Sequence, residues 1–501
     1  MLNDFYKHLK SGTDIRGVAV DGVPDEPLTL TNEATEKIAQ GFVCWLFNEF
    51  GRQDGFTVAI GHDSRISANR LKSVFVENLV MAGINVKDCG LSSTPAMFMT
   101  TVDFGCDAAV QITASHHPFN KNGFKFFTRK GGLEAYDIEQ ILQYAQDGVA
   151  FKAEKSGEIE ETAYMNIYSE KLREFICKEV NANDYSRPLR GFKIIVDAGN
   201  GAGGFYASKV LEPLGADITG SQFLEPDGLF PNHVPNPENS QAMHSISRAT
   251  VSYGADLGII FDTDVDRAAC VGKNGKEINK NALIALASCI ALEGNEGGTV
   301  VTDSVTSSGL KDFIENHLGG KHHRFKRGYK NVINEALRLN RDCCQNAPLA
   351  IETSGHAAMR DNYFLDDGAY LITRIIIKMA QLAKEGKTLE SLIETLVEPL
   401  DAEEYRIKIL DKDFKEYGIK VVEDLEKFID ESDKFDKALD SFEGIRASSK
   451  ELDGWFLLRL SVHDPILPLN IESNIEGGAE KIKAELKAFL SKYDKLDISS
   501  L

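Results

Sequence analysis

Short apolar runs alternate with longer amphipathic stretches through roughly the first four fifths of the 501-residue chain. Apolar runs of this length are typical of buried strands, and the amphipathic stretches have the period of helices. A repeated strand-helix alternation is the pattern of βαβ units, whose strands lie in parallel sheets. The chain is therefore expected to be mainly α/β.

A chain of this length exceeds what one hydrophobic core usually supports, so several domains are expected. A polar segment at 181–188 and a glycine-rich segment at 294–298 separate three α/β modules. After residue 399 the candidate strands become short, and Asp453-Gly454 is a typical hairpin turn, which indicates a small α+β domain with an antiparallel sheet. The predicted domains are residues 1–187, 188–296, 297–399 and 400–501.

Composition limits the classes of function. The net charge of -20 argues against nucleic acid as a partner, because affinity for nucleic acid comes largely from basic contacts to phosphates. No segment has the length and apolarity of a membrane span, and the first residues lack the apolar core of a signal peptide. The eight cysteines are scattered without a C-x-x-C pair, as expected for free thiols in a reducing compartment. We expect a cytoplasmic protein without a membrane partner.

One polar segment, residues 113–118, follows the apolar run 108–112 and contains Ser115 and two histidines. In open α/β sheets, ligands bind at the carboxyl ends of the strands. Lys125 follows closely in the sequence. A serine near imidazoles and an ammonium group can act as a nucleophile or carry a phosphate, because these neighbours supply proton transfer and charge neutralisation.

A second polar segment, residues 262–267, follows the apolar run 257–261. It places carboxylates at alternate positions, which can converge on a hard cation such as Mg²⁺, and leaves Arg267 to bind a phosphate. The carboxylates are those of Asp262, Asp264 and Asp266.

Two alternatives compete with the magnesium interpretation. A calcium-binding EF-hand loop would require glycine where this chain has Arg267 and a bidentate acid where it has Lys273, so it fails at both positions. A solvated acidic turn has compatible spacing, but it does not explain an arginine beside carboxylates at a strand end.

Five motifs, in order along the chain, resemble those of the α-D-phosphohexomutase superfamily. They are an opening motif at 11–17, a phosphoserine loop at 113–118, a second-domain segment at 226–231 with 235–238, a metal loop at 262–267 and a sugar-binding loop at 352–356. The resemblance implies three similar α/β domains with mixed sheets and a smaller C-terminal α+β domain, arranged around a central active-site cleft.

The resemblance also implies an activity. Members of this superfamily interconvert hexose 1-phosphates and 6-phosphates, so the expected enzyme is an isomerase acting on mannose or glucose phosphates. Ser115 would carry the phosphoryl group and form a bisphosphorylated sugar intermediate, with a hexose 1,6-bisphosphate as activator. Mg²⁺ would be held by a phosphoserine oxygen of Ser115 and by Asp262, Asp264 and Asp266. The expected partner is a phosphosugar, and the protein is expected to be a monomer or homodimer.

Several further residues take roles by the same resemblance. Lys125 and His116 are the candidates for general acid/base work, with Arg16 assisting, while the alternative for His116 is to orient the loop by a hydrogen bond. His117 is interpreted as a loop residue. Asp63 and Arg65 are expected to form a salt bridge that stabilises the first domain.

The sugar hydroxyls are expected to be bound from the third predicted domain. Glu352 and Ser354 would accept and donate hydrogen bonds, and His356 and Lys330 would complete the pocket. The alternative for Lys330 is a solvated helix residue.

The resemblance breaks in the last domain, where the superfamily has a phosphate-binding loop R-x-S-G-T-E-P and an arginine three residues later. Here Arg459 and Ser461 fit, but the glycine is replaced by Val462 and the later arginine by Pro468. Glycine lets backbone amides approach an anion closely, so this loop should be altered. We predict that His463 replaces the lost contact.

Two other functions remain compatible with the motifs. A phosphoglucosamine mutase is one, because the Ser-Gly-His form of the sugar loop does not exclude an amino sugar. A noncatalytic protein that binds a sugar phosphate is another, which the altered last loop favours. The intact Ser115, the three aspartates and Glu352 argue for an enzyme.

Overall fold

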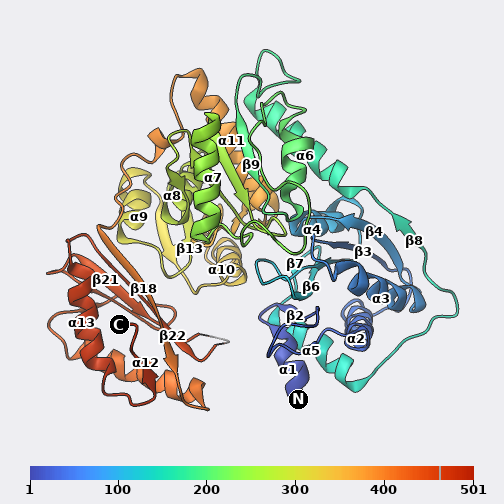
Figure 1. Ribbon diagram of the computed structural model, residues 1–501, viewed down its shortest axis with the longest axis horizontal. Coiled ribbons are helices and arrows are strands. Elements are labelled where there is room, and N and C mark those ends of the chain that lie inside the picture. The colour runs from blue at the N-terminus through green and yellow to red at the C-terminus, as the bar shows by residue number, and fades with distance from the viewer. Residues whose placement is uncertain (462–463) are drawn as a thin grey trace. The chain divides into compact units, whose positions relative to one another are not determined.

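The computed structural model describes residues 1–461 and 464–501, and its chain forms two compact units (Figure 1). The first unit consists of Met1–Asn279 and Ser354–Ser391, and the second of Lys280–Thr353 and Leu392–Leu501. Both units are therefore built from separate stretches of chain.

The first unit begins with a mixed sheet in the order β1-β2-β6-β5-β3-β4-β8, with β7 paired to β6. β3 runs parallel to β4 and β5, while β6 is antiparallel to β5 and β2. The strands are β1 (Lys10–Ser11), β2 (Asp14–Val18), β3 (Thr57–His62), β4 (Asn85–Leu91), β5 (Ala108–Ile112), β6 (Lys121–Thr128), β7 (Gly131–Gly132) and β8 (Ile159–Glu161).

Helices cover both faces of this sheet. On one face, α2 and α3 contribute Phe42 and Phe75 to a core with the strand residues Phe124 and Phe126. On the other, α4 packs against β3, β5 and β6. Local signals set the ends of α2, whose amino end is capped by Thr31 and whose last turn closes on a glycine with positive φ. The helices are α1 (Asp4–Leu9), α2 (Asn32–Phe50), α3 (Ala68–Met81), α4 (Thr94–Asp103), α5 (Ala135–Asp147) and α6 (Tyr164–Val180).

A second mixed sheet follows in the order β12-β11-β10-β9. Its strands are β9 (Ile194–Asp197), β10 (Leu257–Phe261), β11 (Ala268–Gly272) and β12 (Glu277–Ile278). α7 (Ser240–Tyr253) packs against β10, and α11 (Gly368–Lys384) packs against β11 and α6. The hairpin of β16 (Ala357–Met359) and β17 (Leu365–Asp366) also belongs to this unit.

The second unit contains a parallel β14-β13-β15 arrangement and a separate antiparallel sheet. The parallel strands are β13 (Thr299–Thr302), β14 (Lys321–Arg324) and β15 (Leu349–Ile351), and the accompanying helices are α8 (Lys280–Leu292), α9 (Ser308–Asp312) and α10 (Tyr329–Asp342).

The last sheet has the order β19-β20-β21-β22-β18-β23 and is antiparallel at every pair. Its strands are β18 (Asp401–Ile409), β19 (Asp436–Lys437), β20 (Ile445–Ser449), β21 (Gly454–Leu458), β22 (Ile466–Ser473) and β23 (Leu496–Asp497). One hydrophobic core joins one face of the sheet to α12 (Phe414–Asp430) and α13 (Gly478–Leu490). The predicted hairpin turn joins β20 to β21.

The predicted fold class, three α/β domains and a C-terminal α+β domain, is confirmed. The four domain boundaries stay predictions. Within residues 1–461 and 464–501, no helix has the length and apolarity needed to cross a bilayer.

Candidate active site

Ser115 lies in the loop between β5 and β6, and only 1% of its surface is exposed. Its φ of 51° is in the left-handed region, which non-glycine residues rarely adopt. The backbone amide of Ser115 donates to Thr113 Oγ1 at 2.8 Å, and that hydroxyl donates to Asp63 Oδ2 at 2.7 Å. These hydrogen bonds hold an unusual backbone conformation that presents the serine.

Arg65 fixes the same loop from behind. Its guanidinium donates to the carbonyl oxygens of Ser115, His117 (2.6 Å) and Pro118 (2.7 Å). It also forms an ion pair with Asp63 at 3.3 Å, with both side chains fully buried. Burial raises the pKa of Asp63 to about 6, and the charge of Arg65 opposes this shift. The predicted salt bridge is present, and Arg65 also positions the serine loop.

The acidic loop follows β10 and meets the serine loop within the first unit. Ser115 Oγ donates to Asp262 Oδ2 at 3.2 Å, and the amide of Arg267 donates to Asp262 Oδ1 at 3.1 Å. Asp262, Asp264 and Asp266 are buried, and one ligand oxygen from each lies within 4.8 Å of the others. Burial and repulsion from the other two carboxylates raise the pKa of Asp262 well above its usual range.

This donor set fits a divalent cation. Among the described residues, Oδ1 of Asp264 and Oδ1 of Asp266 are buried and accept no hydrogen bond. Buried carboxylate oxygens are normally satisfied by donors or by a metal. Three carboxylates and a serine oxygen are hard ligands of the kind Mg²⁺ prefers. The carboxylate oxygens left without donors are therefore available to a magnesium ion.

Lys125 lies on β6, opposite Gln111 of β5. Its ammonium group donates to Asp266 and lies 3.2 Å from Asp264 Oδ2. Thr94 Oγ1 also donates to Asp264 Oδ2. The lysine predicted for proton transfer thus lies directly against the acidic loop.

His116 and His117 lie beside the serine, and their rings stack with centroids 5.2 Å apart. His116 Nδ1 is 3.3 Å from Ser115 Oγ. Burial lowers the pKa of His116 far below its usual range and that of His117 to about 3. The contact between His116 Nδ1 and Ser115 Oγ is the geometry that either role requires, orienting the loop or moving a proton.

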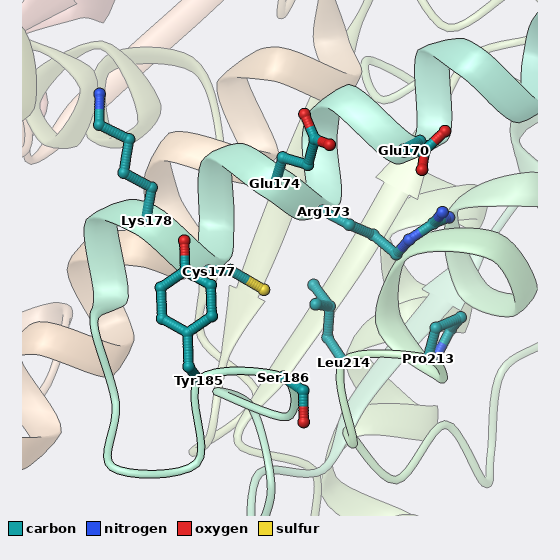
Figure 2. Close-up of a pocket in the computed structure, with 9 residues that line it drawn as sticks. All are labelled: Glu170, Arg173, Glu174, Cys177, Lys178, Tyr185, Ser186, Pro213 and Leu214. Atoms are coloured by element: carbon teal, nitrogen blue, oxygen red, sulfur yellow. The ribbon is translucent and has the colours of Figure 1, made fainter.

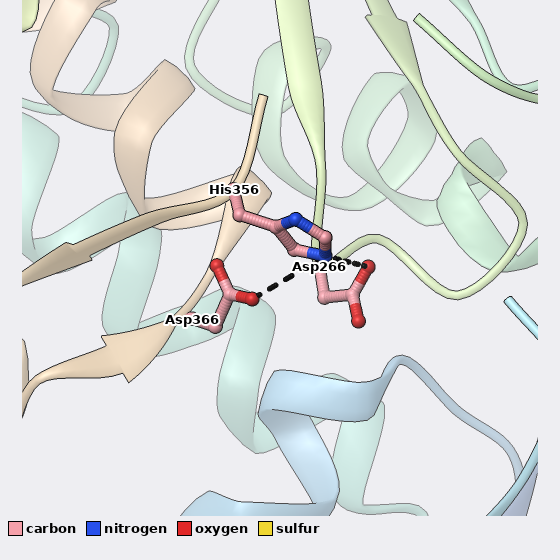
Figure 3. A group of neighbouring side chains, drawn as sticks. All are labelled: Asp266, His356 and Asp366. Carbon is pink, nitrogen blue, oxygen red and sulfur yellow. Dashed lines mark ion pairs between the residues drawn. The ribbon is translucent and has the colours of Figure 1, made fainter. Parts of the chain in front are cut away.

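Arg267, the last residue of the acidic loop, contacts two side chains from outside the loop, Glu238 and His356. Arg267 Nη1 donates to Glu238 Oε2 at 3.2 Å, and its Nε donates to His356 Nε2 at 3.1 Å. His356 Nε2 is 3.7 Å from Asp266 Oδ1 and 3.5 Å from Asp366 Oδ2 (Figure 3). His356 was predicted to complete a sugar pocket, and the structure places it at the acidic loop.

The atoms of Asp266, His356 and Asp366 are also close enough together to hold an ion. However, His356 Nε2 already accepts a hydrogen bond from Arg267, so its lone pair is occupied. The group is therefore a hydrogen-bonded support of the acidic loop.

Arg16 lies on β2, opposite Gly123 of β6, and its Nη2 donates to Asp14 Oδ2 at 2.7 Å. A Cβ at residue 123 would lie 2.2 Å from Ile15 O and 3.0 Å from Arg16 Cγ. Glycine at 123 is therefore required for this close approach of β2 and β6.

In the second unit, Glu352 follows β15, and its Oε1 accepts a hydrogen bond from the Gly328 amide at 2.6 Å. Lys330 lies in the first turn of α10. Asp303 follows β13, and its Oδ2 accepts from Thr353 Oγ1 at 2.7 Å. Burial, together with repulsion from Glu352, raises the pKa of Asp303 to about 7.

Arg459 and Ser461 lie at the end of β21. The Arg459 amide donates to Pro468 O at 3.1 Å, while Arg459 Nε is buried and makes no hydrogen bond within the described part of the chain. Burial lowers the pKa of Arg459, and the nearby charge of Glu443 opposes this shift. Glu443 in turn accepts hydrogen bonds from Ser304 Oγ and the Arg327 amide. The predicted contact at His463 lies outside the described residues.

Sequence reasoning missed the roles of Thr94, Glu238, Asp303, Asp366 and Glu443. Glu238 lies in a segment that the motif comparison had singled out, at 235–238, so the signal was present without a role. The other four have no motif around them. The contacts of Thr94, Asp303 and Glu443 join residues that are far apart in sequence, and that of Asp366 with His356 depends on the β16–β17 hairpin.

A surface cavity of about 540 Å³ lies along α6 and contains none of the predicted site residues (Figure 2). Its charges are mixed, with two acidic and two basic side chains on α6, so they select no ligand class. It is lined by Glu170, Arg173, Glu174, Cys177, Lys178, Tyr185, Ser186, Pro213 and Leu214.

Three family models match consecutive parts of the chain. They are phosphoglucomutase/phosphomannomutase alpha/beta/alpha domain I at 9–156, domain II at 166–275 and domain III at 279–400. A relative from Thermococcus kodakarensis, named phosphoglucomutase/phosphomannomutase, is 31% identical over 470 residues, covering 92% of this chain and 95% of the relative. The chain belongs to the phosphoglucomutase/phosphomannomutase family.

Other members of this family match over similar lengths. A phosphomannomutase/phosphoglucomutase from Pseudomonas syringae pv. tomato is 28% identical over 480 residues, covering 96% of this chain and 94% of the relative. The crystal structure of a phosphoglucomutase/phosphomannomutase family protein from Burkholderia thailandensis has a TM-score of 0.80 at 24% identity, with 98% of each chain covered. The open form of pp63/parafusin from Paramecium has a TM-score of 0.72 at 16% identity, covering 98% of this chain and 96% of that one. These structural matches show a shared fold.

Proposed function

We propose that this protein is a phosphohexomutase that interconverts hexose 1-phosphates and 6-phosphates of mannose, glucose or both. The hydrogen bond from Ser115 Oγ to Asp262, in a loop of three buried carboxylates, carries this proposal. A serine that attacked a carbonyl would need a general base and an oxyanion hole, not an acidic cluster. The names of the relatives support the same reaction.

In this proposal Ser115 carries a phosphoryl group, gives it to a sugar hydroxyl and receives the other phosphate of the resulting bisphosphate. Asp262, Asp264 and Asp266 would hold Mg²⁺ together with an oxygen on Ser115. When bound, Mg²⁺ supplies positive charge against the oxygens of the transferring group. Arg65 keeps the serine loop rigid, and His116 orients the hydroxyl.

Proton transfer at the sugar hydroxyl is assigned to Lys125, with Arg16 assisting. Lys125 already contacts Asp266 and Asp264, so its ammonium is held beside the reacting group. Arg267 is held by Glu238 and His356, which fixes its charge next to the acidic loop. We propose that Glu352, Ser354 and Lys330 bind the sugar hydroxyls, and that His356, which was expected beside them, positions Arg267.

The proposal is tested by incubating the purified protein with Mg²⁺, a trace of hexose 1,6-bisphosphate and a single sugar 1-phosphate. The substrates are the 1-phosphates of glucose, mannose, glucosamine and N-acetylglucosamine, and 6-phosphate formation is measured. We expect turnover of the glucose or mannose compound. If none of the four sugar 1-phosphates is converted, the mutase proposal is refuted. If an amino-sugar 1-phosphate is converted best, the proposed substrate changes to that amino sugar.

The phosphate that is not being transferred is assigned to Arg459 and Ser461. Removing the guanidinium in Arg459→Ala should raise KM by about ten- to a hundredfold, because a charge-assisted hydrogen bond to the phosphate is lost. Steady-state kinetics would measure this change, with Lys420→Ala on α12 as the control for loss of a surface charge. Unchanged kinetics would show that this loop does not bind the phosphate.

We also propose a cytoplasmic enzyme, consistent with eight cysteines that are all free in the structure. A monomer or homodimer stays a prediction.

A further inference from the structure

Pro468 occupies the position where an arginine was expected to complete the phosphate-binding loop. The sheet register shows what lies beside it. The Arg459 amide donates to Pro468 O, and Pro468 pairs across the other edge of β22 with Arg406 of β18. Arg459, Pro468 and Arg406 therefore form one row across three neighbouring strands.

All three side chains project from the same face of the sheet. The neighbouring residues Leu458, Leu469 and Ile407 belong to the hydrophobic core under α12 and α13. Because side chains alternate along strands, the row at 459, 468 and 406 projects from the opposite face. The influence of Glu404, two residues before Arg406, on the pKa of Arg459 agrees with this placement.

This face meets the parallel-sheet part of the same unit. Arg446, which also alternates with core residues, donates to the carbonyl oxygens of Ser304 (2.8 Å) and Thr306 (3.0 Å). Trp455 lies under the Arg446 guanidinium at 3.4 Å from its ring centroid. The row is thus on the side of the sheet that faces Asp303, Arg327 and Glu443. α12 lies on the opposite side.

Arg406 is available to a ligand on that face. Its side chain is 73% exposed, and its Nε lies 3.5 Å from Glu404 Oε1. Strands are about 4.8 Å apart, so the Arg406 and Arg459 backbones are separated by about 10 Å, and two arginines can both reach an anion placed between them. Pro468 is buried between the two arginines and carries no charge, so only Arg459 and Arg406 offer a cation in this row.

We propose that Arg406 supplies the second guanidinium of the phosphate site, in place of the arginine that is missing at 468. This inference rests on the proposed function. The ligand is the dianionic phosphate of a sugar phosphate, bound between Arg459 and Arg406. Because either phosphate of the bisphosphorylated intermediate would occupy this site in turn, Arg406 contributes binding in every complex of the cycle.

An interaction that is equally strong in the substrate complex and in the transition state lowers KM and leaves kcat nearly unchanged, so its loss raises KM alone. Arg406→Gln should raise KM for the preferred hexose 1-phosphate about tenfold, with kcat within about twofold of the unmodified protein. The same variant should bind glucose 6-phosphate about tenfold more weakly in a calorimetric titration, which does not require turnover. Lys420→Gln removes an exposed charge from α12, on the other side of the sheet, and should change neither constant.

A second variant restores the missing arginine. The hydrogen bond from the Arg459 amide to Pro468 O shows that the backbone of residue 468 faces β21, so an arginine there would add a donor to that ladder. Arg406→Gln combined with Pro468→Arg should recover KM and the dissociation constant to within about threefold of the unmodified protein. Recovery would show that the two positions serve the same anion.

The outcomes separate the two proposals. If Arg406→Gln and Lys420→Gln have the same KM and the same affinity for glucose 6-phosphate, the proposed role of Arg406 is overturned, whatever the mutase activity. A lower kcat with unchanged KM would also overturn it. If the unmodified protein turns over none of the sugar phosphates but its glucose 6-phosphate binding depends on Arg406, the mutase proposal fails and the phosphate site stands. If the unmodified protein neither turns over the sugar phosphates nor binds glucose 6-phosphate, the mutase proposal and the phosphate site are both refuted.

Discussion

Replacing Ser115 with alanine should abolish mutase turnover, lowering kcat by more than about 1,000-fold. The variant removes the hydroxyl that would carry the phosphoryl group and the hydrogen bond to Asp262. Alanine and serine both have a Cβ, so the positive φ at this position strains them similarly. The loss should therefore be chemical, with the loop still held by Arg65.

The measurement is 6-phosphate formation, together with intact-protein and peptide mass spectrometry. Phosphate should be found on the peptide that contains Ser115 and be absent from Ser115→Ala. Ser64→Ala is a matched control, since its hydroxyl oxygen is buried and makes no hydrogen bond within the described residues. Substantial turnover by Ser115→Ala would mean that another residue carries the phosphate, and the proposed mechanism would be wrong.

The second large effect is expected at the acidic loop. Asp264→Asn keeps the size of the side chain but removes one of the three buried carboxylates, so Mg²⁺ should bind weakly. We expect kcat to fall by about 100-fold or more, since charge stabilisation of a transferring phosphoryl group depends on the metal. Chelation of the metal should likewise stop the unmodified enzyme, and added Mg²⁺ should restore it.

Thermal unfolding gives a readout that does not depend on activity. A cation that binds only the folded state stabilises it by mass action. Added Mg²⁺ should therefore raise the Tm of the unmodified protein and have little effect on Asp264→Asn. Asp256→Asn, a change at the start of β10 and away from the loop, should keep the full Mg²⁺ response. An equal rise in Tm for Asp264→Asn would show that Mg²⁺ binds elsewhere.

The meeting of Ser115 with Asp262 could be predicted because both follow apolar strands and the motifs fixed their roles. The fold class was predictable for the same reason, since periodicity separates the α/β part from the antiparallel last sheet. The partners of these residues were not predictable. Lys125 meets Asp266 and Asp264 only because β6 lies beside β5, and that register has no signal in the sequence.

The irregular backbone after β9 also has no signal in the sequence. The chain there forms a short 3-10 turn at Ala202–Gly204 and a π-helix at Tyr206–Leu211. Close packing explains the glycines, because a Cβ at Gly201 would lie 2.6 Å from Thr263 O, in the acidic loop. Arg406 was overlooked because only the pairing of β18 with β22 places it beside Pro468.

The discontinuity of the first unit has a consequence for how a ribosome can make this protein. α11 packs against α6 and β11, its Thr373 hydroxyl is 2.8 Å from Tyr206 Oη, and Tyr168 donates to Asp367 at 2.7 Å. These contacts complete the layer behind the acidic loop, yet α11 is synthesised only after all of Lys280–Thr353. The nascent chain must therefore keep an incomplete first unit while much of the second unit is made. Because incomplete units expose hydrophobic surface, aggregation is expected in this interval, and a chaperone is most useful then.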